Sequence, residues 1–98
     1  MSAITMPLPT RISLESYSTW LNAMRGQIAA LGTTHGAVNE YVGLQRGYLS
    51  KILSPRPLKN AGGPILLWLS QALGFRVVLE SDEVLLAEAS KRLPAIRD

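Results

Sequence analysis

The sequence predicts a mainly α-helical domain of four to five helices with one short C-terminal β-strand. Apolar residues recur at spacings of three and four over most of the chain, and glycine or proline separates these segments. Only Phe75–Glu80 alternates with a period of two. A chain of 98 residues fits one domain. We expect a flexible arm over residues 1–12, one domain over 13–93 and a frayed tail over 94–98.

The first predicted helix covers Leu14–Leu31, because apolar side chains alternate spacings of three and four from Leu14 onwards. Ser13 is a candidate N-cap, and Gly32 is placed to end the helix. Trp20 lies on the flank of the apolar stripe, where we expect partial burial.

Two shorter helices are predicted around Gly43. Thr33 or Thr34 can cap a helix over residues 35–42, and a second helix begins at Leu44 or Gln45 and ends near Leu53. Gly43 stands where a sharp turn needs positive φ. This arrangement predicts a helix-turn-helix motif over residues 35–53, whose second helix can enter a DNA major groove.

The remaining segments predict one helix, one strand and a last helix. Pro64 suits the start of a fourth helix that ends before Gly74, with Trp68 at the edge of its inner face. The strand Phe75–Glu80 has no convincing partner in the chain, so we expect it to pair with the same strand of another copy. Ser81 or Asp82 can cap a helix over 83–93, with contacts from Val84, Leu85, Ala89 and Leu93.

The pattern resembles the Cro/C1-type (Xre-like) helix-turn-helix family of small bacterial and phage regulators. The matching residues are Val38, Val42, Gly43, Leu44, Leu49 and Ile52. Asn39 departs from the family, which usually has a small residue there that packs against the second helix. The resemblance covers about residues 14–73 and implies a DNA-binding transcriptional regulator, commonly a repressor.

Charge distribution supports a polyanion as the partner. The net charge is +3, and no acidic residue lies between Glu40 and Glu80, whereas five basic residues do. Arg46 and Gln45 are expected to reach base edges, and Gly47 allows close approach of the backbone. Tyr48 and Ser50 are further candidate contacts. Lys51, Arg56 and Lys59 are expected to contact phosphates.

Other chemistries find little support in the sequence. The chain has no cysteine and one histidine, and it lacks a nucleophile elbow and a phosphate-binding glycine loop. We therefore expect neither enzymatic activity nor a metal or cofactor. No apolar run is long enough for a membrane span. The absence of cysteine suits a reducing cytoplasm, where we expect the protein to act.

Two functions from different classes remain open at this point, and a third interpretation makes the C-terminal strand and helix the functional element with the front half as a scaffold. The first is a sequence-specific DNA-binding regulator, acting as a homodimer on double-stranded DNA. The second is a module of the same fold that binds and inhibits another regulator or a toxin, as an antiactivator or antitoxin does. Candidate residues for a partner or dimer contact are Trp68, Phe75, Val77, Val78 and Leu79.

Overall fold

A computed structural model describes residues 9–57 and 59–96 of the chain. These residues form five helices, α1 (Tyr17–Leu31), α2 (His35–Val42), α3 (Tyr48–Leu53), α4 (Gly63–Ala72) and α5 (Glu83–Arg92), and no strand. The mainly helical class is therefore confirmed, whereas the predicted strand over Phe75–Glu80 is not formed. Residues 1–8 of the expected arm and 97–98 of the expected tail lie outside the described residues.

Helix α1 begins later than the periodicity predicts. Ser16, rather than Ser13, is the N-cap, and its Oγ accepts a hydrogen bond from the Thr19 backbone N–H at 3.2 Å. Ser16 itself has extended backbone angles (φ −156°, ψ 166°), so the residues before it are outside the helix. The helix ends at Gly32, as predicted.

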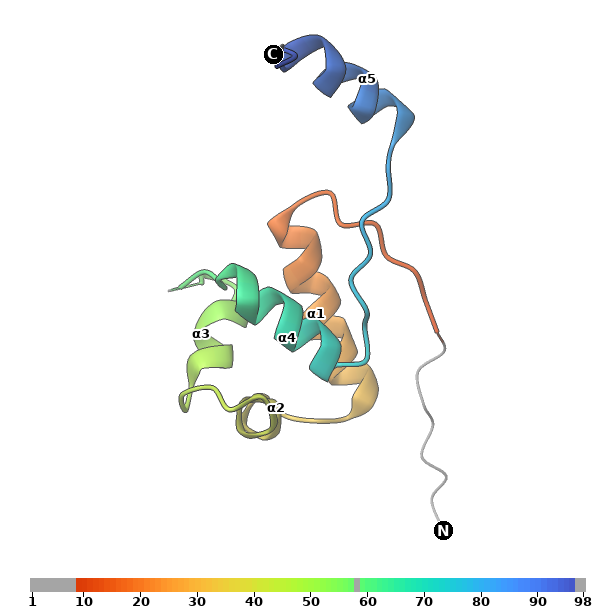
Figure 1. The fold of residues 1–98 in the computed structure, drawn as a ribbon. Coiled ribbons are helices and arrows are strands. Elements are labelled where there is room, and N and C mark those ends of the chain that lie inside the picture. The colour runs from red at the N-terminus through yellow and green to blue at the C-terminus, as the bar shows by residue number, and fades with distance from the viewer. Residues whose placement is uncertain (1–8, 58, 97–98) are drawn as a thin grey trace.

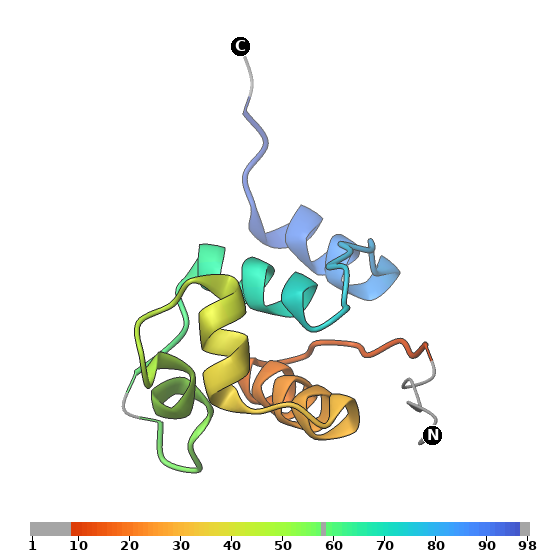
Figure 2. The same cartoon turned by 90° about the horizontal axis from the view of Figure 1, so that it is seen from below.

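Helices α2 and α3 flank a turn over residues 43–47. Helix α2 has its predicted bounds, and Thr34 Oγ1 accepts a hydrogen bond from the Ala37 N–H. Helix α3 begins at Tyr48 because Gly47 adopts φ 79°, a left-handed conformation that an α-helix excludes. In Figure 1, α2 is seen end-on and α3 from the side. In Figure 2, α2 is seen from the side and α3 end-on, so the axes of the two helices cross at a steep angle.

Helices α1, α2, α3 and α4 share one hydrophobic core. Its ten buried apolar side chains are Trp20, Leu21, Met24, Ile28, Val38, Leu49, Ile52, Leu53, Leu69 and Leu73. The prediction of a flanking, partly buried Trp20 is wrong, because this side chain is only 1% exposed. Its Nε1 donates a hydrogen bond to Ser70 Oγ at 2.9 Å, which satisfies the one polar atom of the indole inside the core.

Helix α5 lies apart from this core. It contains no buried residue, and it stands away from α1–α4 at the end of a drawn-out connection in Figure 1. The predicted contacts of Val84, Leu85 and Leu93 are therefore wrong, since all three are exposed, and Ala89 is half-buried. Trp68 on α4 is also more open than predicted, at 55% exposed.

Candidate nucleic-acid interface

Helix α3 is short, and the rest of the chain holds it in place. Six residues are too few for a helix that is stable alone. Three of the six, Leu49, Ile52 and Leu53, are buried in the core, and α3 packs against both α1 and α2. Its position is therefore determined by tertiary contacts rather than by its own helix propensity.

The N-terminal end of α3 is capped from another helix. Gly47 occupies the N-cap position and has no side chain to offer. Asn39 of α2 is buried, and its Oδ1 accepts a hydrogen bond from the Leu49 N–H at 3.1 Å. Asn39 thus supplies the cap that Gly47 lacks, which gives a buried polar side chain at this position a structural role.

The C-terminal end of α3 is held by Arg25 of α1. Arg25 Nε donates to the Leu53 carbonyl oxygen at 2.7 Å, and Nη2 donates to the Ser54 carbonyl oxygen at 3.0 Å. The Asn22 side-chain oxygen accepts a third bond from Nη1 at 2.9 Å. A cation there complements the partial negative charge of a helix C-terminus. Bonds at both ends therefore fix the orientation of α3.

The outer side of α3 presents polar and basic side chains. Ser50 and Lys51 are exposed on the helix, and Gln45 and Arg46 are exposed in the preceding turn. Sequence reasoning placed Gln45, Arg46 and Gly47 in the first turn of the helix, and that placement is wrong. All three nevertheless remain adjacent to the exposed side of α3.

Two contacts connect α3 to neighbouring segments on this side. His35 Nδ1, at the start of α2, lies 3.0 Å from Ser50 Oγ, at hydrogen-bond distance. Lys59 Nζ lies 5.0 Å from the centroid of the half-buried Tyr48 ring, a cation–π distance. These contacts place the start of α2 and the loop after α3 beside Tyr48 and Ser50, two of the candidate DNA contacts on α3.

The basic side chains of this region are free of acidic partners. The ion pairs among residues 9–57 and 59–96 are Arg11 with Glu80 and Arg92 with Glu88. None involves Arg46, Lys51, Arg56 or Lys59, and all four are exposed. Unpaired, exposed cations attract polyanions, because no neighbouring carboxylate cancels their charge.

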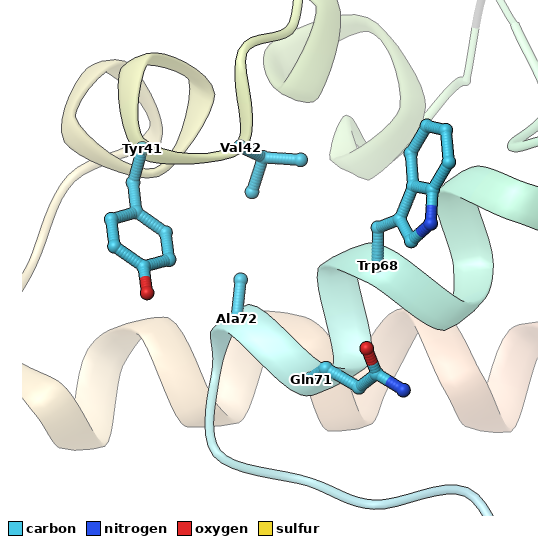
Figure 3. A pocket seen from close by; sticks show the side chains of 5 residues that line it. All are labelled: Tyr41, Val42, Trp68, Gln71 and Ala72. Carbon is cyan, nitrogen blue, oxygen red and sulfur yellow. The ribbon is translucent and has the colours of Figure 1, made fainter.

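An open depression of about 280 Å³ lies between α2 and α4 (Figure 3). It is lined by Tyr41, Val42, Trp68, Gln71 and Ala72. Tyr41 and Trp68 stand on opposite sides of it, and both are largely exposed. The described residues contain no cluster of three or more potential metal ligands. The depression offers apolar contact area and three polar groups, the tyrosine hydroxyl, the tryptophan indole N–H and the glutamine amide.

The predicted residues lie in three separate places. The candidate DNA contacts, at residues 45–48, 50, 51, 56 and 59, belong to α3 and its flanking turns, and Trp68 is exposed on α4. Val77, Val78 and Leu79 are exposed on the connection to α5, and Phe75 is half-buried against the core. Sequence reasoning missed Arg25 altogether and did not assign His35 a contact. Asn39 was noticed only as a departure from a pattern.

Comparisons with protein-family models, curated proteins and solved structures give no match to this chain. Within the described residues, none of the helices is long and apolar enough to cross a lipid bilayer.

Proposed function

We propose that this chain binds double-stranded DNA through α3 and the turn before it, and that it acts as a helix-turn-helix transcriptional regulator. The observation that carries the proposal is that a short helix, bonded at both ends by Asn39 and Arg25, has exposed and unpaired basic side chains around its outer side. A fixed helix flanked by free cations suits the reading of a groove between two phosphate backbones.

The side chains have different roles in this proposal. Arg46 and Gln45, in the turn before α3, contact base edges, where arginine favours guanine and glutamine favours adenine. Ser50 and Tyr48 add hydrogen bonds from hydroxyl groups. Lys51, Arg56 and Lys59 contact phosphates, and these contacts fix the register of the protein on the duplex without reading its sequence.

The test is a titration of fluorescent genomic DNA fragments, including those that flank the gene of this protein, at several salt concentrations. With the three phosphate contacts of Lys51, Arg56 and Lys59 per chain, the log–log slope of affinity against salt should be about −3 per chain. Lys51→Ala should weaken binding to all fragments alike and reduce that slope by about 1. Arg46→Ala should cost about 1–3 kcal/mol and relax sequence preference.

Lys91→Ala provides the matched control. Lys91 is an exposed cation on α5, outside the stretch between Glu40 and Glu80 that contains basic residues and no acidic ones. Its removal should leave DNA affinity nearly unchanged. Equal losses for Lys51→Ala and Lys91→Ala would mean that only net charge matters, and no loss for Arg46→Ala would contradict the assigned orientation of α3.

A second candidate function is a protein-interaction module that inhibits another regulator or a toxin. The observation in its favour is that α5 has exposed Val84, Leu85 and Leu86, with no cover from the rest of the described chain. Tagged protein should then retain a defined partner from nuclease-treated lysate. Leu85→Ser should abolish that retention while Lys51→Ala leaves it intact, and recovery of no partner would remove this alternative.

A further inference from the structure

Most of the connection between α4 and α5 has no backbone hydrogen bond to the rest of the described structure. Phe75 still donates its N–H to the Ser70 carbonyl oxygen at 2.9 Å. In the described structure, residues 76–81 make no backbone–backbone hydrogen bond, and they form neither helix nor strand. A drawn-out segment of this kind presents unpaired N–H and C=O groups, which another extended segment can bind by forming a ladder.

The side chains of this connection are apolar where an ordinary loop is polar. Phe75 packs half-buried against the core, and Val77 and Leu79 follow at the alternate spacing that one face of a strand requires. Leu79 is 98% exposed and Val78 is 65% exposed. The segment therefore has the pattern of a strand with a face that is covered at one end and open at the other.

The two charged residues of the segment have opposite signs and lie at equal distances in sequence from Val78. Arg76 lies two residues before it and Glu80 two residues after it, with Val77 and Leu79 between. In an antiparallel pair of identical segments with Val78 on the two-fold axis, each Arg76 faces Glu80 of the other copy, and each Val77 faces Leu79. Opposite charges and apolar side chains are thus matched at every position from 76 to 80.

We propose that residues 76–80 pair in this antiparallel register with the same residues of a second copy of the chain. The proposal does not depend on DNA binding. It accounts for the missing ladder partner and for the exposure of Leu79, which would lie beside Val77 of the other copy. The occupant is a second copy because the segment is complementary in charge to itself.

Other arrangements of two copies match the side chains less well. Parallel pairing in register places Arg76 opposite Arg76 and Glu80 opposite Glu80, and like charges directly opposite destabilise a sheet. An antiparallel shift that puts Leu79 on the axis places Glu80 opposite Val78 and Val77 opposite Ser81. It places Arg76 opposite Asp82, whose carboxylate already caps α5. A shift that puts Val77 on the axis leaves both charges without an acidic or basic partner.

The ion pair within the chain is compatible with this register. Arg11 Nη2 donates to Glu80 Oε2, and both side chains are exposed. The second carboxylate oxygen of Glu80 remains available for Arg76 of the other copy, since a carboxylate accepts several hydrogen bonds. Arg76 forms no ion pair within the described chain. Pairing between copies would give this cation its partner.

The first test is a set of single-cysteine variants, which are informative because the chain has no cysteine of its own. Val78→Cys should form a disulfide-linked dimer under mild oxidation, because the two side chains face each other across the axis. Val77→Cys and Leu79→Cys should form far less, since each lies diagonally from its own counterpart, beyond the roughly 7 Å Cα separation that a disulfide tolerates. Equal cross-linking of all three, or none by Val78→Cys, would overturn the register.

The second test reverses the charges. Arg76→Glu or Glu80→Arg alone should weaken dimerisation by on the order of tenfold, and the double variant should restore it. These variants are made in an Arg11→Gln background, because Arg11 would otherwise repel the arginine introduced at position 80. Arg11→Gln alone should dimerise like the wild type.

Sedimentation velocity over a concentration series gives the readout, and circular dichroism verifies that each variant is folded. Recovery in the double variant supports the facing of Arg76 and Glu80. A double variant as weak as the single ones contradicts it. A wild-type chain that remains monomeric throughout the series would overturn the proposal and assign the segment to a different protein.

Discussion

The two parts of this chain differ in burial: helices α1–α4 bury many of their apolar side chains, whereas α5 leaves similar apolar side chains exposed. Among the described residues, the ten buried apolar side chains lie from Trp20 to Leu73, in α1–α4 and at the C-cap of α4. Helix α5 has apolar side chains at helical spacing and buries none. The difference shows that amphipathic spacing alone does not form a core. A helix buries its apolar face only where the connecting segments bring it against another element, and residues 76–82 lead α5 away from α1–α4.

The largest expected effect compares the same residue type in the two parts. Leu69→Ala should destabilise the protein by about 2–5 kcal/mol, because Leu69 is completely buried and its truncation leaves a cavity. Leu85→Ala on α5 should change stability by no more than about 0.5 kcal/mol, since Leu85 is largely exposed. Urea denaturation of dilute protein measures both, and a similar cost for the two variants would remove the distinction.

The next effect concerns the buried indole. Ser70→Ala should cost about 1–3 kcal/mol, because it leaves the buried Trp20 Nε1 without its acceptor. Ser90→Ala, at an exposed position of α5, is the control and should be nearly neutral. Urea unfolding curves followed by tryptophan fluorescence provide the comparison. A neutral Ser70→Ala would show that the indole N–H has another partner.

A somewhat smaller loss is expected at the cap of α3. Asn39→Ala should cost about 1–2 kcal/mol, because the Leu49 N–H loses its acceptor. The exposed Asn60→Ala is the control and should have little effect. Thermal unfolding by circular dichroism measures both. If Asn39→Ala were as stable as Asn60→Ala, the Leu49 N–H would not depend on Asn39 for its cap.

The smallest effect belongs to α5. Arg92 and Glu88 form an exposed ion pair one helical turn apart, with 3.3 Å between Arg92 Nη2 and Glu88 Oε2. Arg92→Ala should cost at most about 0.5 kcal/mol, and high salt should reduce even this difference. Thermal unfolding at low and high salt tests it. A loss above 1 kcal/mol would mean that α5 packs against the remainder of the protein.

Local signals in the sequence were sufficient for much of α1–α4. The bounds of α2, the cap at Thr34 and the helix end at Gly32 follow from residues within a few positions of each other. The cap of α5 at Asp82 is of the same kind, because the Asp82 side chain accepts the Leu85 N–H at 3.0 Å. Such features depend on neighbouring residues and can be predicted from the sequence.

Two of the errors, at Trp20 and Arg25, have a common physical origin, which is contact between residues distant in sequence. Trp20 is buried because Ser70 provides an acceptor, and Arg25 was overlooked because its acceptors are backbone carbonyls of Leu53 and Ser54. Neither contact leaves a spacing signal. The delayed start of α3 depends on the left-handed backbone of Gly47, which sequence reasoning had assigned to close approach of DNA instead.

The candidate site shows the same division. Residues 45–51 could be assigned to one region because they are consecutive in sequence. The hydrogen bonds from Asn39 and Arg25 that fix α3 could not be predicted, because these residues lie outside that stretch. The period of two over Phe75–Glu80 predicted a strand, which the described residues do not form. It could not supply a partner strand, because the chain has no second segment of that pattern.

The contrast between the two parts is tested most directly by hydrogen exchange at several protein concentrations. Amides in α1 and α4 should be protected equally at every concentration, because their core is complete within one chain. Amides of residues 76–80 should exchange rapidly in dilute protein and become protected as concentration rises, when two copies pair. Strong protection of residues 76–80 in dilute monomer, or none at any concentration, would contradict the account.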